Sequence, residues 1–207
     1  MHIDPDDLRG RHVYRLMTSL LIPRPIAWVG SRSPAGVDNL APFSYFMGVA
    51  SRPPAVAISV ARAGRDALKD TARNILETGV FTVSMVSDSL GEAMVQTSVS
   101  WPPEVSEFDA AGLRAVSATR VPAPRPAEAL ACMECRVLHT HDLGTTHLIV
   151  GQVVLFDLDE SILVEGREGN PLVDAAALDP LARLGGLQYA RLGASFEMRA
   201  PPLPEPE

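Results

Sequence analysis

The apolar residues of this chain follow two different periods between residues 55 and 86. Residues 55–61 (AVAISVA) and 80–86 (VFTVSMV) show the two-residue alternation that is typical of β-strands. Between these strands, apolar residues recur at helical spacing: Leu68, Ala72, Ile75 and Leu76. Gly79 follows at a position where glycine commonly ends a helix. The pattern therefore predicts two strands joined by a helix that begins within residues 66–71.

Further elements are predicted on both sides of this unit. Before it, the pattern predicts a helix at 14–21 that stops before Pro23, a strand at 26–31, a turn at 33–38 and a strand at 39–47. After it, the pattern predicts a short helix at 87–98, a proline-rich connector at 110–127, long strands at 130–140 and 146–158 and a glycine-containing tail at 180–198. Pro42 interrupts the strand at 39–47, which implies a sheet edge or a bulge.

The order of these elements favours one fold class. There are at least six strands, two or three helices and no regular β-α-β alternation, so we expect a mainly β (α+β) fold, an antiparallel sheet closed into a small barrel with peripheral helices. No G-x-G-x-x-G pattern follows a strand, which disfavours a Rossmann fold.

Composition limits the classes of partner. The 207 residues are 46% hydrophobic and 21% charged, as in ordinary globular proteins, and we expect one domain over residues 1–200 with a disordered tail at 201–207. A formal net charge of -7 argues against nucleic acid or an anionic membrane as a partner. The chain shows neither a secretory leader nor an apolar run near the roughly 18 residues of a membrane span, so we expect a cytoplasmic protein.

Three segments in the first third of the chain carry the candidate chemistry: residues 24–31 (RPIAWVGS), 39–46 (NLAPFSYF) and 69–71 (KDT). Pro23 and Pro25 enclose Arg24, and because a following proline holds a residue in an extended conformation, a stiff backbone aims this side chain. Trp28 is expected to pack in the core, since a lone tryptophan in an apolar strand is more often core than a stacking platform.

Residues 39–44 suit the wall of a flat aromatic ligand. Pro42 removes one backbone N–H and leaves neighbouring backbone groups outside a regular ladder, while the side chains of Asn39 and Ser44 can donate hydrogen bonds. The alternative interpretation is a core strand with a proline at a bulge.

The predicted helix that follows offers a site for a phosphate, because a helix N-terminus has unpaired N–H groups and a partial positive charge. Candidate ligands are Lys69, the only lysine of the chain, together with Thr71, a second cation from Arg62 or Arg65, and Ser59. Asp70 is expected to cap the helix, and Arg73 to be solvated.

Cys132 and Cys135 form a C-x-x-C pattern with His139 and His141 downstream, which raises the alternative of a structural zinc module. These cysteines lie in a predicted strand, where residues three apart face opposite sides. We therefore expect no metal site, and one buried cysteine beside a more exposed one.

The motifs occur in an order that resembles the flavin reductase-like family of FMN-binding split-barrel proteins. The resemblance rests on RPIAWV, NLAPFSYF, Pro53-Pro54 and KDT, and on EFDAAGL at 107–113, ECRV at 134–137, HLIVGQVV at 147–154 and RLGGLQYARLG at 183–193. It implies an antiparallel six-stranded split barrel of Greek-key type, and a homodimer with the flavin near its interface. It further implies cofactor contacts from two clusters, Arg24, Pro25, Ile26 and Ala27 and then Asn39, Leu40, Ala41, Pro42 and Ser44, besides Ser59, Arg62, Lys69 and Thr71.

The activity that this resemblance implies is hydride transfer from NADH or NADPH to FMN, with FAD as the alternative flavin, and transfer of electrons to an acceptor or a monooxygenase partner. Near the flavin, Arg24 would favour the anionic reduced form. His147 is the candidate catalytic residue, as a nicotinamide contact, although Gly144-Thr145-Thr146-His147 replaces the family's Gly-Asp-His and a surface histidine is the alternative. An FMN-binding electron carrier or flavin store would use the same binding residues, so this alternative stays open.

Overall fold

The computed structural model describes residues 1–64 and 67–201. Arg65, one of the two arginines considered for the phosphate, lies outside the described residues, as does Asp66. The expected tail is described only at Pro201.

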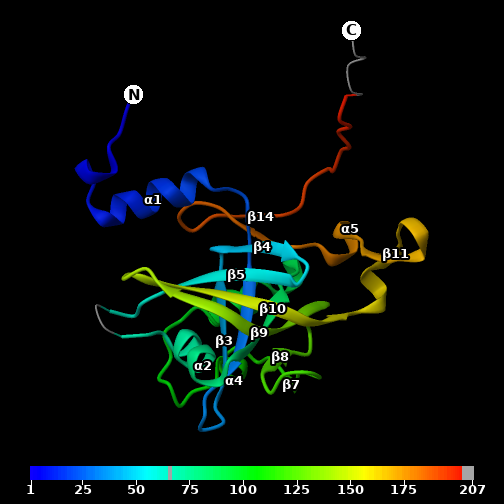
Figure 1. Cartoon of the computed structure of the whole chain (residues 1–207), viewed down its shortest axis with the longest axis horizontal. Coiled ribbons are helices and arrows are strands. Elements are labelled where there is room, and N and C mark those ends of the chain that lie inside the picture. The colour runs from blue at the N-terminus through cyan, green and yellow to red at the C-terminus, as the bar shows by residue number, and fades with distance from the viewer. Residues whose placement is uncertain (65–66, 202–207) are drawn as a thin grey trace.

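The centre of the fold is an antiparallel sheet of seven strands within the described residues, in the order β3-β2-β6-β9-β10-β5-β4 (Figure 1). In chain order these strands are β2 (Ala27–Arg32), β3 (Asp38–Phe43), β4 (Phe46–Ser51), β5 (Pro54–Ala61), β6 (Val80–Met85), β9 (Ala131–Asp142) and β10 (Thr146–Leu158). The sheet curls, so that β3 comes into contact with β5 as well as with β2. The predicted antiparallel, mainly β fold is confirmed.

Smaller sheets and helices surround this curled sheet. β1 (Arg24–Pro25), β13 (Ala182–Arg183) and β14 (Tyr189–Ala190) form one small sheet, β7 (Ala115–Ser117) pairs with β8 (Pro124–Pro126), and β11 (Leu163–Glu165) pairs with β12 (Pro171–Val173). The α-helices are α1 (Gly10–Leu20), α2 (Asp70–Thr78), α3 (Gly91–Gln96), α4 (Glu107–Ala110) and α5 (Ala175–Leu178). The 3-10 turns are η1 (Pro5–Asp7), η2 (Asp88–Leu90), η3 (Glu160–Ile162) and η4 (Arg167–Gly169).

The sheet has one strand more than the six expected, because the predicted strand at 39–47 divides into two. After β3 the chain leaves the sheet at Ser44, and β4 pairs with β5 at the opposite edge. Pro42 lies in β3, an edge strand of the main sheet, and pairs with Trp28 of β2. Because no further strand pairs with β3 beyond it in this order, the N–H that proline lacks is not needed there. The edge position predicted from this proline is confirmed.

The predicted helix between the central strands is also confirmed. α2 begins at Asp70, inside the predicted range, and Gly79 ends it with a φ of 73° and an N–H bonded to the carbonyl of Ile75 at 2.8 Å. The connector at 110–127 was too simple a prediction, because it contains β7 and β8. Prolines are tolerated in β8 since it is a short edge strand.

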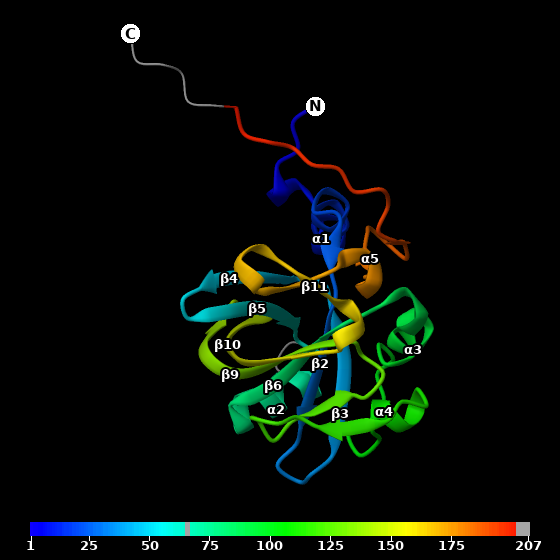
Figure 2. The ribbon, with the colours of Figure 1, turned by 90° about the vertical axis from the view of Figure 1, so that its right-hand side faces the viewer.

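Two apolar clusters cover the two faces of β2. On one face Val29 packs with Phe81 and with Ile75 of α2. On the other face Trp28 packs with Leu40 of β3 and with Met94 of α3. Figure 2 shows α3 and α4 beside β2 and β3, away from the curled part of the sheet. Trp28 is fully buried, so its predicted role in the core is confirmed. None of the helices within residues 1–64 and 67–201 has the length and apolar character needed to cross a membrane.

Candidate functional site

A cavity of about 450 Å³ lies between β3, the N-terminus of α2 and the segment that follows α3. Six residues predicted from the sequence line it: Asn39, Ala41, Pro42, Arg62, Lys69 and Thr71. The structure therefore brings the expected wall and the expected phosphate ligands to one place. The lining also contains residues that were not predicted as ligands, namely Ala63, Asp70, Glu107 and residues 97–101.

One end of the cavity lies at the N-terminus of α2, where the sequence predicts phosphate ligands, and we call it the phosphate end after that prediction. Lys69 is the N-cap residue, has an exposed side chain and makes no capping hydrogen bond. The prediction that Asp70 caps the helix is wrong, because its carboxylate accepts from the guanidinium of Arg73 instead. No side chain therefore occupies the first-turn N–H groups as a cap, which keeps them available to an anion.

Thr71 belongs to a buried polar network. Its Oγ1 accepts a hydrogen bond from Nδ2 of Asn39 at 3.0 Å, and the same Nδ2 lies 3.3 Å from Oγ of Ser31. Asn74 donates to this serine at 3.3 Å as well. Because the Thr71 oxygen acts as the acceptor in this network, its hydroxyl hydrogen can be donated to a ligand.

Arg62 enters the lining of the cavity from the end of β5. Its Nη2 donates to Oδ2 of Asp142 at 2.6 Å, whereas its buried Nε has no hydrogen-bond partner among the described residues. The N–H of Gly144, and then the Arg62 guanidinium, lower the pKa of Asp142 below its usual value. An unpaired buried donor beside a cavity is a group that an anionic ligand can satisfy.

His147 lies next to this ion pair but not in the cavity lining. It pairs with Val60 and Asp142 in the sheet, and its Nε2 is buried 3.8 Å from Oδ2 of Asp142. Ser59 is not part of the cavity lining either. The structure thus does not bring these two predicted residues to the cavity, and their contacts with cofactor or nicotinamide stay predictions.

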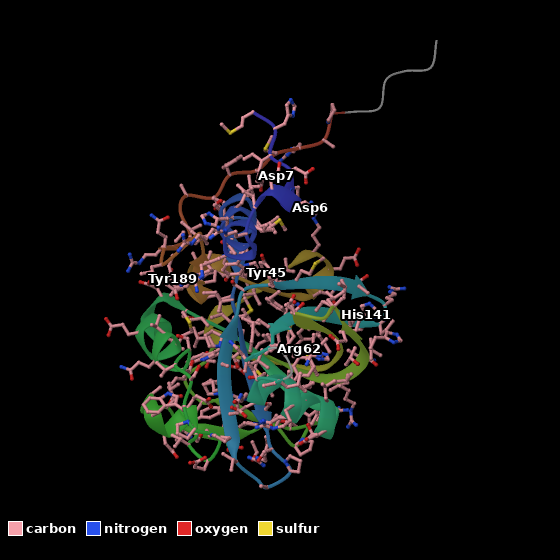
Figure 3. The ribbon with its side chains drawn as sticks, turned by 90° about the vertical axis from the view of Figure 1, so that its left-hand side faces the viewer. Asp6, Asp7, Tyr45, Arg62, His141 and Tyr189 are labelled. Carbon is pink, nitrogen blue, oxygen red and sulfur yellow. The ribbon has the colours of Figure 1, made fainter. Side chains whose placement is uncertain are left out.

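The other end of the cavity meets a smaller groove of about 200 Å³, which we call the hairpin groove. It shares Pro42 and Ser98 with the cavity and is further lined by Tyr14, Ile26, Phe43, Ser44, Met94, Arg183 and Tyr189. In Figure 3, Tyr189 and Tyr45 lie toward the end of the molecule that carries α1, whereas Arg62 lies nearer to α2. The two spaces therefore adjoin each other at Pro42 and Ser98 and together follow β3.

Four predicted wall residues are placed differently from Asn39 and Pro42. The side chain of Ala27 is buried in the core, Leu40 is buried against Trp28, and Pro25 lines a separate groove on the side of α5. Arg24 is 7% exposed, and four of its five N–H groups are used, by Ser44 Oγ and by the carbonyls of Thr18, Leu21 and Leu184. Arg24 thus joins the end of α1, the end of β3 and the C-terminal hairpin.

Two buried glutamates differ in what surrounds them. Glu134 is fully buried, and its carboxylate accepts backbone N–H groups from Thr119, Arg120 and Val121, which fixes that loop. Glu107 lines the cavity and accepts from the N–H of Leu40 at 3.0 Å. Burial raises the pKa of Glu107, with a smaller contribution from Asp70, because it has fewer donors to offset desolvation.

The segment at 97–101 is held by the core. Nε1 of Trp28 donates to Oγ1 of Thr97 at 2.8 Å, and Thr97 donates to the carbonyl of Met94 at 2.8 Å. The sequence predicted the end of a short helix at Thr97 and Ser98 but gave no reason to place the segment beside a ligand. Its place in the cavity depends on a contact across 69 residues, which no local pattern reveals.

The cysteine prediction needs a correction. Cys132 and Cys135 are both buried, at 1% and 0% exposure, because β9 is covered on both faces at this point. Burial raises the pKa of Cys132 to about 11 and raises that of Cys135 further, so both thiols stay protonated at neutral pH. Within the described ranges, no group of three or more His, Cys, Asp or Glu side chains is arranged to hold a metal ion.

Comparison with known protein families identifies the family of this chain. A family model described as "Flavin reductase like domain" matches residues 17–177. The chain belongs to the flavin reductase-like family. Its matched region contains β1 to β12 and every residue of the cavity lining.

Two solved structures of related sequence have folds closely similar to that of this chain. The chain is 34% identical to nitrilotriacetate monooxygenase component B from Bacillus cereus, with a TM-score of 0.88 over 96% of this chain and 98% of that one. It is 30% identical to 2-nitrobenzoate 2-nitroreductase NbaA from Pseudomonas fluorescens, with a TM-score of 0.87 over 97% and 96% of the two chains. A split-barrel structure from Shewanella frigidimarina has the same fold, with a TM-score of 0.82 at 22% identity and coverage of 97% and 99%. The split barrel expected from the resemblance is confirmed.

Proposed function

We propose that this flavin reductase-like protein binds FMN and transfers hydride from NADH or NADPH to it, and that the electrons then pass to an acceptor or to a partner oxygenase. FAD is the alternative flavin. The observation that carries this proposal is the single cavity that joins the Asn39 to Pro42 wall with the N-terminus of α2. The proposal also rests on family membership and on the functions for which two similar structures are named, a monooxygenase component and a nitroreductase.

The donors around the cavity fit a flavin phosphate. Lys69 supplies a positive charge, the first turn of α2 supplies N–H groups, and Thr71 supplies a hydroxyl. Arg62 Nε is a buried donor that has no partner within residues 1–64 and 67–201. The chemistry that these residues would hold in place is the flavin's own capacity to accept a hydride and release electrons.

The remaining residues of the cavity would position the flavin and exclude water from it. Ala41 and Pro42 present a wall with few free donors, and Val99 and Trp101 line the same cavity from the segment after α3. Thr97, held by Trp28, anchors this segment to the core. The groups at the wall include neither a nucleophile nor a paired general base, and their task is positioning and exclusion of water.

An absorbance titration tests the proposal. The purified protein is mixed with FMN, and NADH or NADPH is then added without oxygen. Bleaching of the bound flavin supports reductase activity. A bound flavin that stays oxidised would identify a carrier or flavin store, and absence of FMN binding would remove the proposal altogether.

The acceptor is tested separately, because the two similar structures are named for different reactions. We propose a monooxygenase as the acceptor. A reduced protein that supports the turnover of an added two-component monooxygenase supports this choice. Reoxidation by nitroaromatic compounds without any oxygenase activity would replace it.

We also propose a homodimer with the flavin near its interface. β4 is an edge strand of the main sheet with exposed apolar residues, Met47 at 59% and Val49 at 46%, and α1 lies toward the same end of the molecule (Figures 1 and 2). Exposed apolar edge strands are normally covered. Tyr14 of α1 lines the hairpin groove, which brings this end of the flavin path close to that surface.

Light scattering on a sizing column tests the dimer. The Val49→Glu variant should run as a monomer, whereas Val164→Glu should remain a dimer, because Val164 has the same 46% exposure on β11. A Val49→Glu variant that is still dimeric would contradict the proposed interface.

A further inference from the structure

Residues 192–200 (LGASFEMRA), which we call the C-terminal arm, have the pattern of a β-strand but no partner strand within the described residues. Apolar residues alternate with glycine or polar residues along the arm: Leu192, Ala194, Phe196, Met198 and Ala200. This two-residue period is typical of a strand with one buried face. Phe196 and Met198 are nevertheless 82% and 86% exposed, and the arm belongs to no helix or strand.

The backbone of the arm is unpaired as well. Among residues 1–64 and 67–201, no backbone hydrogen bond joins the arm to another segment. Glu197 and Arg199, on the polar side of the alternation, pair with each other at 3.7 Å. Figures 1 and 2 show the arm leading away from the body of the molecule, at the end that carries α1 and β4. The arm therefore offers free N–H and C=O groups and one apolar face, and its own chain covers neither.

β4 has the complementary features at one edge of the main sheet. In the described part of the chain it pairs with β5 alone, and its Met47 and Val49 side chains are exposed. The other edge strand, β3, contains Pro42 and lies against α4, and both features protect a sheet edge. β4 (FMGVAS) contains neither a charged residue nor a proline, and a Cβ atom added at Gly48 would meet no atom within 4 Å. β4 is thus an unprotected edge with room for another strand.

A second copy of this chain is the occupant that these two features favour. The arm begins after β14, in the small sheet whose strand β1 contacts β4, so arm and edge lie on the same side of the molecule. Because each copy carries both an arm and an edge, a twofold-symmetric dimer makes the same contact twice. Addition of an extended segment to a free sheet edge is a common mode of recognition, in which main-chain hydrogen bonds provide affinity.

We propose that the C-terminal arm of one copy adds as a further strand to β4 of a second copy, with Phe196 and Met198 packed on the apolar surface around Met47 and Val49. The proposal rests on the homodimer of the proposed function, because it needs a second copy, but it needs no flavin. It identifies the segment that closes the open edge of the sheet.

Photo-crosslinking tests the position of the arm. The Phe196→p-benzoylphenylalanine variant keeps an aromatic ring at this position and reacts with its neighbours on irradiation. Covalent dimers should appear on a denaturing gel, and mass spectrometry should map the cross-link to residues 46–51. The matched control is Val164→p-benzoylphenylalanine on β11, which should give no covalent dimer. A cross-link within one chain, a cross-link to another segment or an absence of covalent dimers would overturn the proposal.

The alternation along the arm provides a matched pair of variants. Phe196→Asp places a charge on the apolar face and should raise the dissociation constant of the dimer about 10- to 100-fold. Ser195→Asp places the same charge on the polar face, where the change should stay below about threefold. Sedimentation over a concentration series measures both constants, and thermal unfolding shows whether both variants are folded. Equal dissociation constants for the two variants would contradict a strand with one buried face.

The outcomes separate the arm from the proposed function. If Val49→Glu is a monomer while Phe196→Asp dimerises like the parent, the dimer stands and the assignment of the arm is wrong. If Phe196→Asp weakens the dimer but NADH and NADPH do not reduce bound FMN, the reductase proposal fails and the arm stands. A parent protein that is monomeric at every concentration would overturn both the homodimer and the arm.

Discussion

The two ends of the cavity are built in different ways. The phosphate end consists mainly of one stretch of chain, Lys69 to Thr71, whose backbone N–H groups and side chains come together when α2 forms. The opposite end is assembled from α1, β3, the end of α3 and the C-terminal hairpin, and long-range hydrogen bonds of Arg24 and Trp28 hold it.

This difference decides what a substitution does. At the phosphate end the exposed side chain of Lys69 can be removed without disturbing the surrounding core, so its loss should affect the phosphate and little else. At the assembled end a hydrogen bond holds several segments, so its loss should affect stability and every ligand alike. A comparison of FMN with riboflavin, which has the same ring and no phosphate, measures this distinction.

The largest effect is expected for Lys69→Ala. Loss of a charge-assisted contact should weaken FMN binding about 10- to 100-fold and leave riboflavin binding unchanged. Fluorescence titration measures both. Arg73→Ala on the same helix is the matched control, because Arg73 pairs with Asp70 and does not line the cavity. Equal losses for FMN and riboflavin would show that Lys69 does not bind the phosphate.

Thr97→Val is expected to act mainly through stability. The substitution preserves the shape of the side chain but leaves the buried N–H of Trp28 without its acceptor, which costs about 1 to 3 kcal/mol of unfolding free energy. FMN and riboflavin should weaken by the same factor. Urea unfolding and the two titrations check this, and a selective loss of FMN would place Thr97 at the phosphate instead.

Thr71→Val makes the same chemical change at the other end. FMN binding should weaken about fivefold, equivalent to about 1 kcal/mol for one hydrogen bond, while riboflavin binding is retained. Asn39 keeps Ser31 as an acceptor, so the cost in stability should be smaller than for Thr97→Val. The contrast between the ends breaks down if Thr71→Val lowers the unfolding free energy more than Thr97→Val.

The smallest expected effect concerns pH and Glu107, which lines the cavity beside β3. Burial raises its pKa in the folded protein above the ordinary value of 4.5, so the folded state holds the proton more tightly than the unfolded chain does. Stability from this group is therefore present below the ordinary pKa and is lost as pH rises through the raised value.

Glu107→Gln removes this titration and can still accept from the N–H of Leu40. The unfolding free energy of the variant, relative to the parent, should therefore improve as pH rises through that window. Urea unfolding at a series of pH values measures the difference. A difference that is the same at every pH would show that Glu107 titrates like an exposed carboxyl.

The sequence predicted the locally built end better than the assembled one. Lys69, Thr71 and the helix that carries them follow from periodicity and from Gly79, which act over a few residues. Pro42 correctly indicated an edge strand, because the missing N–H constrains the strand wherever it lies.

The sequence predicted less where tertiary contacts decide which way a side chain points and what surrounds it. A contiguous run of wall residues was predicted for β3, but successive strand side chains point to opposite faces, and Leu40 accordingly packs in the core. Residues 97–101 and the part of the hairpin groove contributed by α1 and the C-terminal hairpin were missed, because they depend on Trp28 and Arg24, whose partners lie 69 and 160 residues away. Hydrogen bonds of that range leave no periodic trace in a sequence.

The hydrogen bonds of Arg24 also have a consequence for the order of folding. Its guanidinium binds carbonyls at the end of α1 and the carbonyl of Leu184, so the first helix and the last hairpin share one anchor. During synthesis, α1 leaves the ribosome long before Leu184 does. The N-terminal helix therefore completes its docking only after the C-terminal hairpin has been made, and a nascent chain arrested before residue 184 should leave α1 open to protease.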